Sequence, residues 1–399
     1  MANTSILHAN QLTQKAWSKT FFEYMLANMK LSELMGPPGS GMPIQIDKSL
    51  VGRPGDQVIF ELDLPLSGAG QGDDGTLEGN EESMSFYNMP IVVHERSNAV
   101  RSNGIMTDKR SAVNILKKGF YGLTRWAAEQ FENDLIYALC GIGNQNTYVG
   151  EGTSSIETVN EVAPSTNRIL YGGETVAGVY SSESTDSALG DGGASDYANY
   201  LFGTHCITQM RQAAVLATPK VMPVNINGAY YYVLLIHPLQ RKALRAQTGE
   251  TGWASIVQAA HVRGLGNWMF RKEGSGKERM FNGVVGVLDD VIIYESERLP
   301  TRVAGEVFTS GDTIDSNIVS GTARVARAAL VGQSAVAVCW GKDWARHTEN
   351  FDYNRKPGVA TDAIYGVRKV QFRDPGLAQA ANDAQEDYGV ILHDTCVAD

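Results

Sequence analysis

The stretch "GAGQGDDGTLEGNEESMSF", Gly68 to Phe86, has residue types that could bind a cation. Carboxylate oxygens are the ligands that Ca²⁺ prefers, and glycines allow a loop to wrap tightly around the ion. The window from Glu61 to Glu82 contains no Lys or Arg, and its carboxylates are Glu61, Asp63, Asp73, Asp74, Glu78, Glu81 and Glu82. The EF-hand spacing of Asp, Asn, Gly and Glu is absent. We therefore favour a solvated acidic tip, with a calcium loop as the alternative.

Other motifs with ligand or catalytic chemistry are incomplete. "GSGKER" (Gly274 to Arg279) contains Gly-Lys, but it lacks the first glycine and the final Ser or Thr of a phosphate-binding loop. No two histidines share a helical face at a spacing of four, and no GxSxG nucleophile motif occurs. For the indoles of "WGKDW" (Trp340 to Trp344), packing in a core or interface is favoured over ligand binding. These observations predict a protein that is not an enzyme and needs no cofactor.

Composition places the chain among soluble globular proteins. It has 399 residues, 43% hydrophobic and 20% charged, with a formal net charge of -10 that disfavours non-specific binding to nucleic acid or anionic membranes. The four cysteines are far apart in the sequence, so we expect buried, reduced thiols. The N-terminus lacks a secretory signal, and the longest apolar run, Tyr230 to Ile236, is too short to span a membrane. We expect a soluble protein, made and kept inside a cell.

The acidic stretch is predicted to form the tip of a β-hairpin. "DQVIFELDL" (56–64) alternates apolar and polar residues as a half-buried strand does. Its return strand is expected at 85–100, as an edge strand or broken at Pro90. Upstream, residues 10–35 have the pattern of an amphipathic helix, ended by "GPPGSGMP".

A single long helix is predicted from Asp108 to Cys140, with Thr107 as its N-cap and "GIGN" after its end. Its start is basic, with Lys109, Arg110, Lys117, Lys118 and Arg125. Residues 144–196 are polar with weak periodicity, which indicates an irregular insertion. Beyond it, helices are expected at 197–217, after His237 and at 253–262, and strands at 230–237, 283–288, 291–295, 328–339, 364–372 and 388–393. The fold class is α+β, without regular βαβ alternation.

Opposite charges lie on neighbouring elements, an acidic hairpin tip followed by a basic helix start. A hairpin that projects outward does not easily fold back onto its own helix, and a lone hairpin is poorly stable in water. Between subunits, however, opposite potentials steer and align neighbours. We interpret the hairpin as an assembly element, with an interface formed by Asp73, Asp74, Glu78, Glu81 and Glu82 of one subunit and Lys109, Arg110, Lys117 and Lys118 of another.

The sequence resembles a known family over about residues 50–375. The runs "PGDQVIFELDLPLSGAGQGDDGTLEGNEESMSFY", "IHPLQRKALRAQTGETGWASIVQAA", "NGVVGVLDDVIIYESERLP" and "FDYNRKPGVATDAIYGVRKVQF" occur in the same order as in major capsid proteins of tailed phages, in the N-four-like podophage group. The most specific parts are "DGTLEGNEE" and "HPLQ…LR". This family is similar to the Hong Kong 97-type capsid fold.

The resemblance implies an N-terminal arm (1–50), an extended loop with flanking strands (51–107), a peripheral domain with a spine helix and insertion (108–196), an axial domain (197–345), and return strands with a C-terminal tail (346–399). It implies a major capsid protein that self-assembles into pentamers and hexamers of an icosahedral or prolate phage head around double-stranded DNA. A portal partner, and scaffolding or decoration proteins, would follow, with assembly in the bacterial cytoplasm. The alternatives are a nanocompartment shell of the same fold and a calcium-dependent surface-binding protein.

Overall fold

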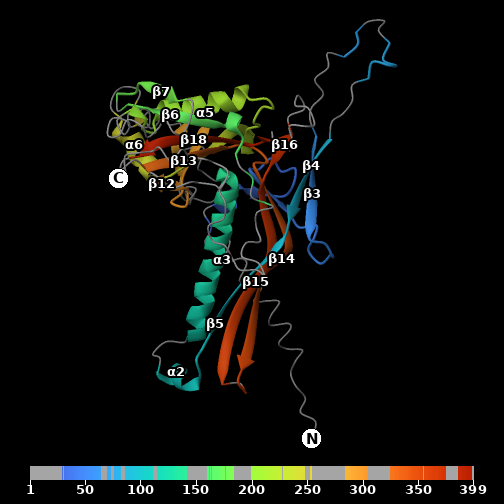
Figure 1. Cartoon of the computed structure of the whole chain (residues 1–399), viewed down its shortest axis with the longest axis vertical. Coiled ribbons are helices and arrows are strands. Elements are labelled where there is room, and N and C mark those ends of the chain that lie inside the picture. Colours follow the sequence, from blue (N-terminus) through green and yellow to red (C-terminus); the bar gives the residue numbers. More distant parts are fainter. Residues whose placement is uncertain are drawn as a thin grey trace, which may run out of the picture.

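The protein is elongated, with a large sheet at one end and a long sheet and helix running to the other (Figure 1). This computed structural model describes residues 29, 31–63, 70–72, 76–81, 86–110, 115–141, 160, 162, 164–175, 177–183, 199–226, 228–247, 252–253, 284–303, 324–353, 355–373 and 385–397. The expected helix at 253–262 and most of the one at 10–35 lie outside these residues. Within the latter range, Leu31–Leu34 is a short 3₁₀ helix, and β1 follows it.

A five-stranded sheet forms the long part of the molecule. Its order is β1-β2-β14-β15-β5, with bounds Met35–Gly36, Ile44–Asp47, Val336–Phe351, Lys356–Lys369 and His94–Arg101. The antiparallel β14–β15 pair is its longest ladder, and two irregularities near Lys342 interrupt the register. The start of β14 and the end of β15 therefore lie at the same end of the ladder, beside the large sheet at the other end of the molecule.

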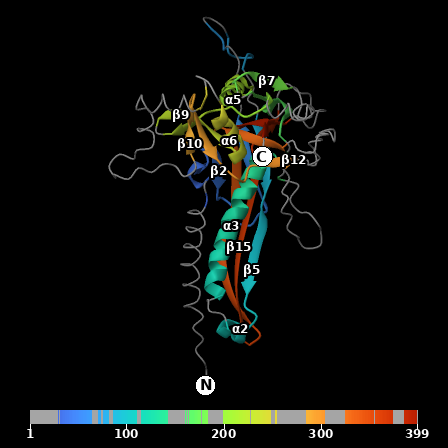
Figure 2. The same ribbon diagram turned by 90° about the vertical axis from the view of Figure 1, so that its left-hand side faces the viewer.

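Helix α3 (Ile115–Cys140) packs along this sheet (Figure 2). Phe131 contacts Trp340 and Tyr365, each with a ring-centroid distance of 5.2 Å, and both indoles of "WGKDW" are buried as expected. The predicted end at Cys140 is confirmed, since Gly141 follows with a φ of 67°. The predicted N-cap is wrong, because Thr107 lies inside α2 (Ile105–Arg110); the described part of α3 begins at Ile115, and residues 111–114 lie outside the described residues.

A nine-stranded sheet forms the other end of the molecule. Its main path is β10-β11-β9-β13-β18-β6-β7, with β8 on β9 and β12 on β13. Their bounds are Val284–Leu288, Val291–Glu295, Ala229–Ile236, Arg324–Val331, Val390–Val397, Ile169–Glu174, Tyr180–Glu183, Val224–Ile226 and Thr301–Val303. Leu235 and Leu392 share one apolar core with the end of α3, whereas Leu234 and Ile391 share a second core with α5 (Thr204–Leu216). Alternate residues of the central strands thus pack into two different cores, one on each face of the sheet.

Several element predictions need correction. The segment 144–196 is not only an irregular insertion, because β6 and β7 belong to the nine-stranded sheet and β6 pairs in parallel with β18. The expected strand at 328–339 is two strands, β13 and β14, which belong to different sheets. The edge strand expected around Pro90 is confirmed, because β4 (Phe86–Val92) forms a two-stranded sheet with β3 (Gln57–Asp63) and Pro90 lies opposite Ile59. The return strand is interrupted at Val93 and not at Pro90.

Helix α6 (Pro238–Ala246) begins where the sequence predicted. The His237 side chain accepts a hydrogen bond from the Leu239 amide, and the Gln240 side chain accepts one from the His237 amide. Proline at the first helical position favours this start because its missing amide proton is not needed there.

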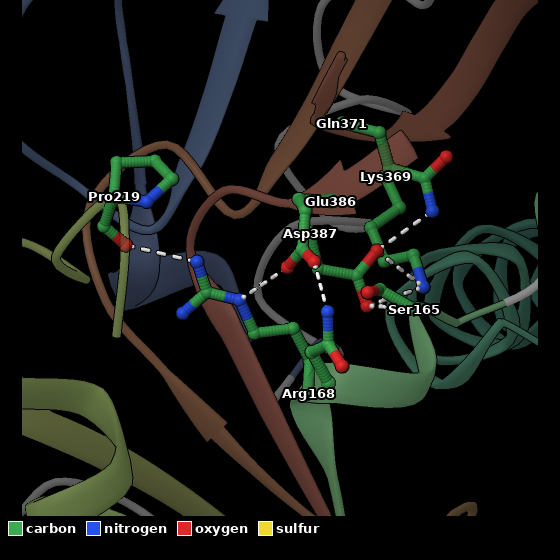
Figure 3. Close-up of polar contacts among 8 residues, drawn as sticks. Ser165, Arg168, Pro219, Lys369, Gln371, Glu386 and Asp387 are labelled. Carbon is green, nitrogen blue, oxygen red and sulfur yellow. Dashed lines mark hydrogen bonds and ion pairs between the residues drawn. The ribbon is translucent and has the colours of Figure 1, made fainter. Parts of the chain in front are cut away.

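Buried ion pairs join the five-stranded sheet, and the short helix before β6, to a small two-stranded sheet that pairs β16 (Gln371–Arg373) with the strand containing Asp387 (Figure 3). Lys369, the last residue of β15, lies 2.9 Å from Asp387 of β17 (Gln385–Asp387), and both side chains are buried. Beside this pair, the Arg168 guanidinium donates to Glu386 and to the Pro219 carbonyl oxygen in the turn after α5. Removing a charge from water is costly unless its partner is present, so these pairs fix β17 against β15 and Arg168, directly before the chain enters β18 of the nine-stranded sheet.

A second buried pair joins the nine-stranded sheet to the end of α3. Arg327 of β13 donates two hydrogen bonds, of 2.8 and 2.7 Å, to the Asp394 carboxylate of β18, and a third to the Cys140 carbonyl oxygen. That carbonyl oxygen belongs to the last turn of the helix, where no helical amide is available to bond it.

Replacing Arg327 should be strongly destabilising. Arg327→Ala leaves Asp394 as an unpaired buried carboxylate, and we expect a loss of about 3–5 kcal/mol in the free energy of unfolding of the unassembled protein, measured with denaturant. Arg125→Ala is the control, because Arg125 pairs with Glu129 at the surface of α3. A midpoint for Arg327→Ala equal to that of the control would contradict the assignment.

His393 makes the protein sensitive to acid. Its ring is fully buried on β18 beside Tyr180 and Phe202, and neither ring nitrogen has a hydrogen-bond partner among the described residues. Burial lowers the pKa of His393 from 6.5 to about 4, because the charged form is poorly solvated there. The stabilising contribution of neutral His393 is therefore present above pH 6.5 and is lost as pH falls towards 4.

We expect His393→Phe to remove this acid-dependent contribution. Between pH 7 and pH 4 the wild type should lose about 3 kcal/mol more of its unfolding free energy than the variant does, at about 1.36 kcal/mol per pKa unit. Denaturant titrations of both proteins across this range measure the difference. Parallel stability curves would show that His393 does not titrate as its burial indicates.

Candidate assembly surface

The described part of the hairpin tip is a small hydrogen-bonded turn. The Asn80 amide donates to the Leu77 carbonyl oxygen at 3.0 Å, and Gly79 has a φ of 86°. A positive φ at the third residue of a turn is typical of type II and favours glycine. The Glu81 carboxylate accepts a hydrogen bond from the Gly79 amide, and Glu78 and Leu77 are exposed. Among the described residues, the tip therefore presents one apolar side chain, that of Leu77, beside the carboxylates of Glu78 and Glu81.

The predicted basic residues are also exposed. Lys109 and Arg110 lie on α2, and Lys117 and Lys118 lie on the first turn of α3. Tyr121, which no sequence pattern singled out, follows Lys117 by one turn and is 57% exposed. Arg125 lies one turn further on the same face. We call Lys117, Lys118, Tyr121 and Arg125 the α3 stripe; the opposite face of the helix packs Phe120, Leu123, Ala127 and Phe131 into the core.

The structure does not bring the acidic tip and the basic residues together within one chain. The described tip residues lie at one end of the long axis and α2 lies near the other, in both views (Figures 1 and 2). Asp73, Asp74 and Glu82 of the predicted interface lie outside the described residues. A contact between the tip and these basic side chains would therefore have to form between two copies.

Specific contacts hold the base of the β3–β4 hairpin on the five-stranded sheet. The Asn160 side chain accepts a hydrogen bond from the Val92 amide and donates one to the Val92 carbonyl oxygen, at 3.1 and 2.7 Å. Arg368 of β15 donates to the Pro90 carbonyl oxygen at 2.7 Å. At Gly366 a Cβ atom would lie 2.2 Å from the Val92 carbonyl oxygen, so only glycine allows this close approach. These contacts fix the direction in which the hairpin leaves the sheet.

Ionic contacts also position α3. Asp134 pairs with Arg96 of β5 at 3.1 Å and accepts a hydrogen bond from the Tyr365 hydroxyl at 2.8 Å. Arg298, after β11, pairs with Glu132 at 3.0 Å and donates to Asn133 at 2.7 Å. One side of the helix is thus tied to both sheets, which leaves the α3 stripe facing outward.

The described residues contain no cluster of three or more His, Cys, Asp or Glu side chains that could hold a metal ion. All four cysteines are free and buried, as expected, and burial raises the pKa of Cys140 and of Cys339 to about 12. Such thiols remain protonated and are poor nucleophiles at neutral pH. None of the described helices is long and apolar enough to cross a membrane.

Comparison with known proteins gives one consistent answer. The family model described as "Phage capsid protein" matches residues 3–399. The major capsid protein of Pseudomonas phage KPP25 is 23% identical over 386 residues, covering 94% of this chain and 93% of that protein. The capsid of Ralstonia phage GP4 matches with a TM-score of 0.66 and 22% identity, over 92% of this chain and 90% of that one. The cyanophage Pam1 capsid matches with a TM-score of 0.62 and 20% identity, over 94% and 93%.

The chain therefore belongs to the phage capsid protein family, whose members are structural proteins of the virion. Within this class its role is that of a major capsid protein, which forms the phage head by assembling with further copies of itself. The mixed α+β architecture matches known phage capsid structures, which confirms the expected fold class at this level.

Loss of the Asn160 side chain should loosen the hairpin base. In Asn160→Ala both backbone groups of Val92 lose their hydrogen-bond partner, and we expect amide exchange in residues 86–95 to become about tenfold faster, since about 1.4 kcal/mol corresponds to tenfold. Hydrogen exchange with mass spectrometry measures this. The exposed Asn350→Ala on β14 is the control, and unchanged exchange at 86–95 in Asn160→Ala would contradict the role of Asn160.

Proposed function

We propose that this chain builds a phage head of pentamers and hexamers with the Hong Kong 97-type fold, and that the acidic tip of one copy docks on the α3 stripe of its neighbour. In this proposal β3–β4 is the extended loop, α3 is the spine helix of the peripheral domain, and the nine-stranded sheet is the axial domain. The division into arm, loop, peripheral, axial and return segments at 1–50, 51–107, 108–196, 197–345 and 346–399 belongs to the same proposal.

The observation that carries the proposal is the opposite placement of two exposed, oppositely charged surfaces. The described part of the acidic tip lies at one end of the molecule, and the start of α3, which contains Lys117 and Lys118, lies towards the other. Identical copies joined head to tail bring such surfaces together and form a closed ring when the rotation between copies is suitable. Opposite charges then guide the encounter and fix its register.

The α3 stripe also has room for the apolar part of the tip. Gly122 lies beside Tyr121 on the exposed face, and a Cβ atom at Gly122 would have no neighbour within 4 Å. We propose that Leu77, which is 67% exposed, covers Tyr121 while the flanking carboxylates meet Lys117 and Lys118. An apolar contact inside a charged rim is the common anatomy of protein interfaces.

The head would enclose double-stranded DNA without sequence-specific binding, and would join a portal protein and, in some heads, scaffolding or decoration proteins. Placement in the N-four-like group rests on the sequence resemblance.

Charge reversal at the tip tests the docking proposal. Glu78→Lys with Glu81→Lys should reduce the yield of assembled particles at least about tenfold near 0.1 M salt, and less at 1 M salt, where screening shortens electrostatic interactions to about 3 Å. Adding Lys117→Glu and Lys118→Glu to the same chain restores opposite charges and should recover assembly. Particles are counted by sedimentation and negative-stain microscopy.

Two matched variants separate docking of the tip from a general effect of net charge. Glu297→Lys adds positive charge at an exposed site outside both surfaces, and should assemble normally. Glu78→Gln with Glu81→Gln removes attraction without adding repulsion, and should have an intermediate yield. Wild-type yields for the reversed tip at both salt concentrations would refute the docking of the tip on the α3 stripe.

A further inference from the structure

One segment of the chain is almost free of charge although much of it lies at the surface. Between Asn199 and Ile236 the only Asp, Glu, Lys or Arg residues are Arg211 and Lys220, whereas 20% of the whole chain is charged. The segment contains α5, the turn that follows it, β8 and β9. At the average frequency these 38 residues would contain roughly seven or eight charges, so two is a marked depletion.

The exposed face of α5 shows this depletion directly. Its exposed residues are His205, Thr208, Gln212, Val215 and Leu216. Arg211, the one charged residue of the helix, is only half exposed and pairs with Asp289 and Asp290 of the β10–β11 turn, at 3.3 and 3.2 Å. The charge of Arg211 is thus directed to a neighbouring turn and compensated there.

Apolar side chains accumulate at the end of this face. Val215 and Leu216 are 41% and 70% exposed, and Met222 is 48% exposed. The Val221 amide donates to the Ala214 carbonyl oxygen at 3.1 Å, which holds the turn containing Met222 against the last turn of α5. β8 begins two residues later, and Tyr230, opposite Asn225 in the β8–β9 pair, is 62% exposed. We call Val215, Leu216, Met222 and Tyr230, with the exposed face of α5, the neutral surface.

We propose that the neutral surface is a contact between copies of this chain, separate from the contact of the acidic tip. Each copy has a net charge of -10, so two copies repel each other through solvent. A contact between them is least costly where the surface carries little charge of its own, and Lys220, in the turn before Met222, is the one exposed charged residue between His205 and Met222. Interface centres are depleted in charged residues and enriched in Tyr and Met, as this surface is.

The occupant is a second copy because the protein is a shell subunit that must cover much of its side surface with its own neighbours. Exposed apolar groups in one region of a soluble protein mark an interaction site when a partner is available to cover them. Since the side chains are neutral, this contact depends on burial of apolar area and is little affected by salt.

Inserting a charge into the neutral surface tests the proposal. Leu216→Glu and Met222→Glu each place a carboxylate where it would lose water on association, and we expect at least about tenfold weaker self-association of the purified protein, equivalent to about 1.4 kcal/mol. Sedimentation velocity over a range of protein concentrations measures association, from small oligomers to shells. The defect should persist in high salt, unlike that of the reversed acidic tip, so failure of one proposal is distinguishable from failure of the other.

Three controls make the result specific. Leu216→Gln and Met222→Gln have similar size without charge and should lose much less association than the Glu variants. Val179→Glu adds the same charge at an exposed apolar residue outside the segment, and should associate as the wild type does. Thermal unfolding of the unassembled variants should be close to that of the wild type, since Leu216, Met222 and Val179 are 70%, 48% and 65% exposed.

Two outcomes would overturn the proposal. The first is that the purified protein shows no dependence on the neutral surface. This would be seen if Leu216→Glu and Met222→Glu self-associate at the wild-type level, or if the wild type itself stays monomeric throughout the concentration range. The second is normal association of the purified variants combined with a head-assembly defect only when other phage proteins are present, which would make another protein the occupant.

Discussion

The arrangement of this molecule depends on buried ion pairs, one that joins β15 of the five-stranded sheet to β17 and one between β13 and β18 of the nine-stranded sheet. Lys369 and Asp387, and Arg327 and Asp394, are each almost fully removed from water, and each charge is stable there only beside its partner. Apolar contacts tolerate sliding, whereas a guanidinium that donates to both oxygens of a carboxylate accepts one geometry. The pairs therefore specify one arrangement of β13, β15, β17, β18 and the end of α3.

Sequence patterns identified the elements governed by local chemistry. The β3 strand, the end of α3 before Gly141 and the capped start of α6 at His237 all followed from alternation, a glycine stop or a capping residue. Errors arose where distant segments decide the outcome. β6 lies in a weakly periodic stretch, and it is a strand because β18 lies beside it. Likewise β13 and β14 form one apolar run that the fold divides between two sheets.

The candidate surface was predictable in its charges and not in its geometry. Clustering of acids near Glu78 and of bases near Lys117 is visible in the sequence. Tertiary contacts such as the ion pair of Asp134 with Arg96 decide that Tyr121 faces outward. Such contacts also place the two charged groups at opposite ends of the molecule. The charge-poor segment that contains α5 was also present in the sequence, but its meaning required knowing which side chains are exposed.

The chain crosses between the five-stranded and the nine-stranded sheet three times, from β5 through α3 to β6, from β13 to β14, and from β15 through β17 to β18. A force that pulls these sheets apart therefore acts along covalent backbone at all three crossings, and the buried ion pairs resist sideways shear. Separation would require strands to be drawn out of a sheet lengthwise, which breaks many hydrogen bonds together and not one after another. In a wall built from such subunits, these crossings would help each subunit to keep its shape under tension.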